Sequence, residues 1–109
     1  MSTTSNVFFV YAPDRDDEEA SQRRAEARLM HVQRAKELIS KGVVKVGGAL
    51  LNALAAETAD KKVVGSAMIL QAASMEEIKR LIEEDAYWVA NVWDKDRIVI
   101  LPFLPATPI

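Results

Sequence analysis

Residues 63–84, VVGSAMILQAASMEEIKRLIEE, join an apolar strand to an amphipathic helix. The predicted strand, residues 63–72, has a consecutive apolar run at its centre, which indicates that both of its faces are covered. Ser74 and Glu77 then form a capping box, which starts a helix over residues 75–84. A strand that passes directly into a helix in this way predicts a fold that mixes the two element types.

The elements outside this stretch complete an alternating order. A helix is predicted over residues 20–41, and Gly42 ends it as a C-cap glycine. Further strands are predicted at residues 7–11, 43–51 and 97–103. Strand, helix, strand, strand, helix, strand is the order of the ferredoxin-like βαββαβ unit, in which both helices lie on one face of an antiparallel sheet. We therefore predict an α+β, ferredoxin-like fold.

Chain length and composition predict one domain over residues 1–109. A chain of this size buries roughly two thirds of its unfolded surface, which suffices for one core. Residues 102–109 form a tail broken by prolines, and a loop ending in Asp60, Lys61 and Lys62 separates the second and third strands.

Composition excludes several classes of function. The net charge is -2 and basic residues are interleaved with acidic ones, so no basic face is expected for nucleic acid. The absence of cysteine excludes thiolate catalysis, and with one histidine it argues against a transition-metal site. The N-terminus has no basic start and only a short apolar run, so we expect no signal peptide, no membrane span and a cytoplasmic protein.

Consecutive apolar residues in the strands predict a homodimer. They occur at residues 7–10, 67–70 and 98–101, whereas a sheet with one face in water should alternate apolar and polar residues. Two helices cover only one face, and a monomer normally leaves at most roughly a few hundred Å² of apolar patch open. We expect a second copy to pack sheet to sheet about a two-fold axis, giving a dimeric α/β barrel as the minimal assembly.

His31, the only histidine, lies on the apolar stripe of the first helix, so its imidazole is expected to point inward. Asp85 takes the i+7 position of the stripe that begins at Ile78 in the second helix. A partly buried carboxylate near the negative end of a helix costs on the order of several kcal/mol unless it is paired. Because both helices lie on the same face of the sheet, we predict a hydrogen bond between His31 and Asp85.

Seven short motifs occur in a characteristic order along nearly the whole chain. They are Arg28-Leu-Met-His31, Gly47-Gly48, Gly65-Ser66, Ser74-Met-Glu-Glu77, Asp85-Ala86-Tyr87, Val92-Trp93 and Ile98-Val-Ile-Leu-Pro-Phe103. Together they resemble the YCII-related domain family. The resemblance implies a dimeric ferredoxin-like barrel, a catalytic dyad at His31 and Asp85, and cofactor-free lyase or dehydrochlorinase chemistry on small cyclic compounds. This chain departs from the family's Asp-Pro-Tyr motif by having Ala86 where the proline usually stands, which leaves the placement of Tyr87 open.

A histidine bonded to a carboxylate is suited to proton transfer. The carboxylate fixes the imidazole tautomer and leaves the other ring nitrogen for the substrate. We therefore predict His31 as the general base or acid and Asp85 as the group that orients it. Such a step typically contributes about 10² to 10⁴ in rate, enough for elimination or isomerisation of a small cyclic or aromatic metabolite without a cofactor.

The other candidate site residues are predicted to bind the substrate. Arg28 lies about one helical turn from His31 and could hold an anionic group. Tyr87, Trp88 and Trp93 could wall a cleft together with Phe103, or belong to the core or the dimer interface. Gly48 with Gly47 could admit a ligand near the backbone or mark a bulge, and Ser66 could line the site or be an ordinary strand residue.

Two alternatives stay open at this point. A non-catalytic module of the same fold could bind a small ligand or a protein, and such a module could bury its histidine completely. The acidic residues Asp14, Asp16, Asp17, Glu18 and Glu19 could bind a hard cation, but contiguous acids that open a helix usually favour its dipole and face solvent.

Overall fold

The structure is a computed structural model that describes residues 6–52 and 61–109. Its elements are β1 (Asn6–Pro13), α1 (Ala20–Ser40), β2 (Val44–Leu51), β3 (Val63–Ala72), α2 (Met75–Glu83), α3 (Ala86–Val89), the 3₁₀ helix η1 (Lys95–Arg97) and β4 (Val99–Pro102). The six predicted elements are present. The last strand is shorter than predicted: η1 takes Arg97, Ile98 links η1 to β4, and the strand ends before Phe103. Asp60 of the predicted loop and the extreme N-terminus lie outside the described residues.

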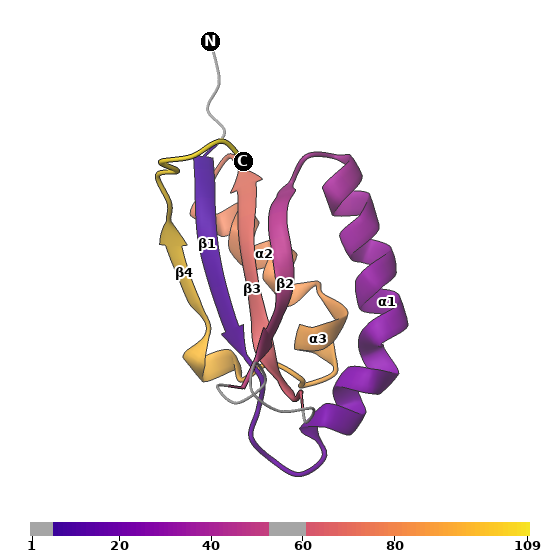
Figure 1. Ribbon diagram of the computed structural model, residues 1–109. Helices are drawn as coiled ribbons and strands as arrows, with labels where there is room; N and C mark the ends of the chain where they lie inside the picture. Colours follow the sequence, from indigo (N-terminus) through magenta and orange to yellow (C-terminus); the bar gives the residue numbers. More distant parts are fainter. Residues whose placement is uncertain (1–5, 53–60) are drawn as a thin grey trace.

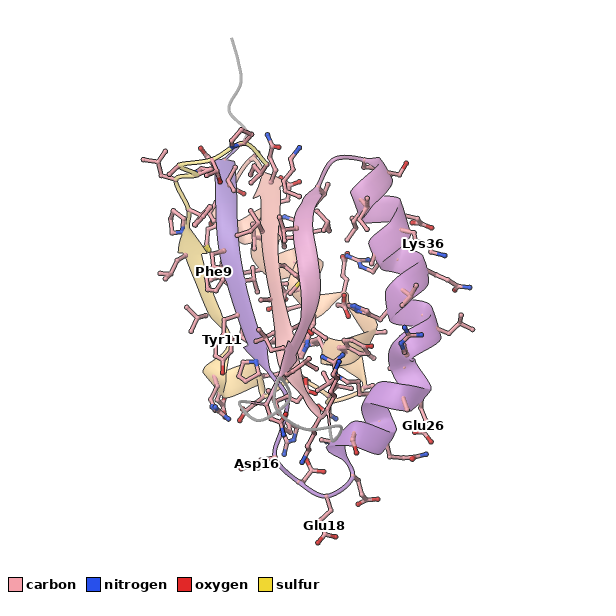
Figure 2. The ribbon with its side chains drawn as sticks, in the orientation of Figure 1. Phe9, Tyr11, Asp16, Glu18, Glu26 and Lys36 are labelled. Atoms are coloured by element: carbon pink, nitrogen blue, oxygen red, sulfur yellow. The ribbon has the colours of Figure 1, made fainter. Side chains whose placement is uncertain are left out.

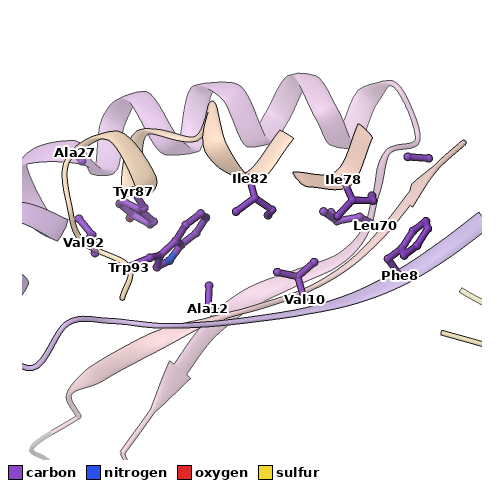
Figure 3. Close-up of a cluster of buried hydrophobic side chains, with 11 residues drawn as sticks. Phe8, Val10, Ala12, Ala27, Leu70, Ile78, Ile82, Tyr87, Val92 and Trp93 are labelled. Carbon is purple, nitrogen blue, oxygen red and sulfur yellow. The ribbon is translucent and has the colours of Figure 1, made fainter. Parts of the chain in front are cut away.

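The sheet has four antiparallel strands in the order β2-β3-β1-β4. The helices lie on one face of this sheet, as Figures 1 and 3 show. This arrangement confirms the predicted ferredoxin-like fold. It also brings α1 and the segment after α2 to the same side of the sheet, although they are far apart in the sequence.

The core lies between this face of the sheet and the helices. Phe8, Val10 and Ala12 alternate along β1 and point toward the helices, where Ile78 and Ile82 of α2 meet them (Figure 3). The segment after α3 adds Val92 and Trp93, both fully buried. Because this segment is held in the core, the residues just before it are fixed close to α1.

The backbone requires glycine at two positions, Gly42 and Gly65. Gly42 ends α1 with φ +78°, a conformation that residues with a side chain rarely adopt. A Cβ atom on Gly65 would lie 2.8 Å from the carbonyl oxygen of Ala12, so the close pairing of β1 with β3 requires glycine. The register of β2 shifts between Val44 and Val46, as a bulge would produce, whereas Gly47 and Gly48 pair regularly with Met68 and Ala67; the bulge therefore precedes the two glycines.

The opposite face of the sheet is apolar and uncovered by any described element. Phe9 pairs with Ile69 on one side and with Leu101 on the other, and all three point away from the helices. Figure 2 shows Phe9 and Tyr11 on β1 on the side of the sheet away from α1. We propose that a second copy of the chain covers this face.

Among the described residues, no helix has the length and apolarity that crossing a membrane requires.

Substitution of an exposed residue on this face tests the proposed dimer. Leu101 is 54% exposed, and a lysine there would place a charge in the apolar interface. We expect light scattering at micromolar concentration to give twice the chain mass for the wild type and the chain mass for Leu101→Lys. Leu29→Lys makes the same change on the outer side of α1 and should stay dimeric; a monomeric wild type would contradict the proposal.

Candidate active site

A cavity of about 460 Å³ lies between α1, the β2–β3 half of the sheet and the end of α2. Its wall includes His31 and Asp85, together with mainly apolar side chains. The residues that line it are Arg24, Arg28, His31, Val32, Ala35, Lys36, Leu38, Ile39, Val44, Gly47, Gly48, Ala49, Ser66, Met68, Leu70, Leu81, Ile82, Asp85 and Tyr87. A wider groove of about 740 Å³ between α1 and α3 lacks the histidine, so the chemistry favours the smaller cavity.

His31 and Asp85 are in direct contact, as the sequence predicts. His31 Nδ1 lies 2.8 Å from Asp85 Oδ1, and the two side chains are 21% and 11% exposed. The pair spans 54 positions of the sequence. With Nδ1 held by the carboxylate, Nε2 is the imidazole nitrogen left for a ligand.

The position of Asp85 differs from the predicted one. The helix α2 ends at Glu83, so Asp85 is not the last residue of its stripe. It is the N-cap of α3, with extended backbone, and its Oδ1 also accepts a hydrogen bond of 2.9 Å from the Tyr87 backbone N–H. The carboxylate therefore satisfies the start of a new helix, and the expected penalty at a helix C-terminus does not arise.

Tyr87 is stacked between two groups from α1. The Tyr87 and His31 rings are 3.9 Å apart and inclined by 13°. The Arg24 guanidinium lies 4.4 Å from the Tyr87 ring centre and, because His31 occupies one face, covers the other. The Trp93 ring meets both His31 and Tyr87 edge-on. These contacts fix the plane of the imidazole.

Arg24 and Asp14 are site residues that the sequence reasoning did not select. The Arg24 side chain donates to Asp14 Oδ2 at 2.9 Å and to Ser66 Oγ at 2.8 Å. Asp14 is mostly buried, so the expectation that it faces solvent is wrong, because the guanidinium compensates its charge. The signal for Arg24 was available: it precedes His31 by seven residues and lies on the same helix stripe.

The remaining acidic residues before α1 agree better with their predicted role. Asp16, Glu18 and Glu19 are exposed. Arg23 binds Asp17 through two hydrogen bonds and holds the pKa of that carboxyl well below its usual range. Among residues 6–52 and 61–109, no cluster of three or more histidine, aspartate and glutamate side chains forms that could hold a metal ion.

Burial controls the protonation of Tyr87. Desolvation raises the pKa of its phenol above the ordinary value, and the nearby charges of Arg24 and Arg28 oppose the rise without cancelling it. The pKa of Tyr87 is therefore higher in the folded protein than in the unfolded chain, where it is about 10. The stability of the fold that depends on the neutral phenol is fully present below pH about 10 and is lost as the pH rises through the folded pKa. Near neutral pH, His31 therefore stacks on an uncharged phenol.

The structure separates the other predicted substrate-binding residues into two groups. Arg28, Gly48, Ser66 and Tyr87 line the cavity with the His31–Asp85 pair. Trp88 and Trp93 do not line it, which corrects the expected aromatic wall.

Local contacts explain the positions of both tryptophans. Trp93 is fully buried behind Tyr87 and donates from Nε1 to Ser66 Oγ at 3.2 Å. Lys95 Nζ lies 4.9 Å from the centre of the Trp88 ring. Phe103, after β4, is also absent from the cavity wall.

Comparison with known proteins identifies the family. The YCII-related domain matches residues 7–103. The chain belongs to this family. It is 34% identical over 103 residues to fusaric acid biosynthesis protein 2 of Gibberella fujikuroi, covering 94% of this chain and 97% of that protein. The protein of the same name from Gibberella moniliformis matches with the same identity and coverage.

A solved structure shares the fold of this YCII-related chain. It is 5-chloro-2-hydroxyhydroquinone dehydrochlorinase from Burkholderia phenoliruptrix, in complex with 2,5-dihydroxybenzoquinone. The two superpose with a TM-score of 0.75 over 90% of this chain and 93% of the other, at 23% sequence identity. At that identity the likeness establishes the fold alone.

The alanine in place of the family's usual proline leaves the local geometry suited to proline. Ala86 is the first residue of α3, where a backbone N–H has no helical partner to lose. Asp85 before it has φ -70° and ψ 143°, the extended conformation that a following proline favours. Tyr87 is therefore placed by the N-cap and by its stacking partners, without a proline ring.

We expect Ala86→Pro to stabilise the protein by about 0.4–1 kcal/mol, because proline restricts the unfolded chain at a position already compatible with it. Ala25→Pro is the matched control, since it breaks the interior of α1 and should cost about 3 kcal/mol. Urea unfolding curves measure both changes. Equal losses in the two variants would show that the start of α3 is not the proline-compatible turn described above.

Proposed function

We propose that the protein is a cofactor-independent enzyme that performs acid–base chemistry on a small cyclic or aromatic metabolite. The observation that carries the proposal is the His31 imidazole, bonded through Nδ1 to Asp85 and set in the wall of a cavity. His31 is the proton-transferring group, and Asp85 holds its tautomer and orientation. The volume of about 460 Å³ falls in the range of small-molecule sites.

The reaction type that fits best is an elimination or an isomerisation beside an acidic C–H. His31 Nε2 takes the proton, and the electrons of the C–H bond form a new double bond. In an elimination the leaving group departs with its own bonding pair, and the imidazolium returns its proton to the leaving group or to water. In an isomerisation a neighbouring double bond of the substrate shifts: its π electrons take the proton back at another carbon, so one double bond forms as the other is lost. Neither step needs an oxidant, a reductant or a metal.

Two comparisons support an enzyme of this kind. A protein with the same fold is a dehydrochlorinase that was solved with a quinone, and a dehydrochlorinase removes HCl by elimination. A relative covered over nearly its full length is named for the biosynthesis of fusaric acid. A pure interaction module could bury its histidine, whereas this imidazole is partly exposed at a cavity.

Substitution of the paired residues tests the proposal. We would assay the wild type for turnover of ring compounds that carry an acidic C–H next to a leaving group, with 5-chloro-2-hydroxyhydroquinone among them. For the compound turned over fastest, His31→Asn should lower the rate by about 10² to 10⁴, because the base is lost. Asp85→Asn should keep a residual rate above that of His31→Asn, because the base remains while its orientation is damaged.

Glu84→Gln provides the control, since it removes a carboxylate next in sequence to Asp85 that does not line the cavity. It should keep the wild-type rate. Circular dichroism would establish that each variant is folded. Full activity in His31→Asn, or no turnover of any compound by the wild type, would contradict the proposal.

A further inference from the structure

We propose that the cavity takes a ring-bearing organic anion, with Arg28 binding the anionic group and the apolar part of the cavity holding the ring. This inference rests on the proposed function and specifies its substrate class.

The charges that line the cavity leave a net positive site. Its basic side chains are Arg24, Arg28 and Lys36, and Asp85 is the only acid among the described residues that line it. Asp85 is engaged by His31, and Arg24 is neutralised by its ion pair with Asp14. Arg28 and Lys36 form no ion pair with a described acid, so even the full charge of Asp85 beside a neutral imidazole leaves the cavity positive. A ligand that brings its own negative charge would compensate one of them.

Arg28 is better placed than Lys36 to bind that charge next to the imidazole. It lies four residues after Arg24 and three before His31, so the three side chains follow one stripe of α1. The charge of Arg28 also acts on the Tyr87 phenol, which stacks on His31. A guanidinium binds a carboxylate or an ionised ring hydroxyl through two parallel hydrogen bonds, which would orient the ring as well as attract it.

The rest of the wall suits the ring. Ala35, Met68, Leu70 and Ile82 offer apolar surface. Gly47 has no side chain, although its backbone does not require glycine: its φ is not positive, and an added Cβ would meet Val44 at 3.4 Å, an ordinary contact. The fold would accept a Cβ atom there, so the absence of a side chain leaves space in the cavity that the fold does not require.

Binding of benzoate and of its neutral isostere benzamide tests the inference without turnover. Both would be titrated into the wild-type protein while the ring signals of the single histidine are followed by NMR. We expect benzoate to bind more tightly than benzamide. Added salt should weaken the binding of benzoate, because it screens the attraction between the two charges. Arg28→Gln should weaken benzoate about tenfold and leave benzamide unchanged, because only the charged hydrogen bonds are lost.

Two variants with the same loss of charge are the controls. Lys36→Gln removes the other uncompensated cation of the cavity, and Lys79→Gln removes a cation of α2 that does not line it. Both should bind benzoate almost as the wild type does. An equal effect of all three substitutions would reveal only a response to net charge, and a loss confined to Lys36→Gln would place the anion elsewhere; either result overturns the inference.

Failure of benzoate to bind, or equal affinities for benzoate and benzamide, would also overturn it. The proposed acid–base function would survive these results, because it depends on turnover and on His31. Conversely, loss of benzoate affinity in Arg28→Gln together with full activity in His31→Asn would retain the anion site and remove the proposed catalytic role.

Discussion

One carboxylate oxygen organises the site. Asp85 Oδ1 accepts one hydrogen bond from the Tyr87 backbone at 2.9 Å and contacts His31 Nδ1 at 2.8 Å. The first contact starts α3, and the second ties α3 to α1 across 54 positions of sequence. A buried carboxylate is energetically costly without hydrogen-bond partners. A substitution that removes either contact of Asp85 therefore displaces the other partner and leaves the carboxylate with fewer hydrogen bonds. Local structure and site geometry therefore depend on the same atom.

Behind that atom, side chains from α1, β3, the segment after α3 and Asp14, which follows β1, form a continuous polar and aromatic support. Arg24 links Asp14 to Ser66, and Ser66 accepts the indole N–H of Trp93. Tyr87 lies between Arg24 and His31. None of the buried side-chain nitrogen and oxygen atoms in this chain of contacts lacks a hydrogen-bond partner, which is what a buried network needs in order to be rigid. The imidazole is consequently held in one plane with its cavity side open to a ligand.

Local patterns predicted most of the fold, because capping boxes, C-cap glycines and apolar runs act within a few residues. They also predicted that His31 points inward and meets Asp85. They failed where one element stops and another begins: the i+7 rule assumed that α2 continues to Asp85, whereas it ends at Glu83, and the short α3 has no periodicity to detect. The sequence reasoning missed Arg24 because a charged residue on a helix is normally expected to face solvent. The acid that compensates it, Asp14, lies in the segment after β1, far from α1 in any local pattern. The burial of Trp93 likewise follows from a tertiary contact with Ser66.

The most direct test of the His31–Asp85 pair uses the fact that the chain has a single histidine. Nitrogen-15 NMR of the labelled imidazole in its neutral form distinguishes which ring nitrogen carries the proton. If Asp85 holds Nδ1–H, the spectrum should show the Nδ1-protonated tautomer with an unprotonated Nε2, and Asp85→Asn should abolish this preference. A wild-type imidazole protonated at Nε2, or a spectrum that Asp85→Asn leaves unchanged, would contradict the assignment of Nε2 as the nitrogen that faces the substrate.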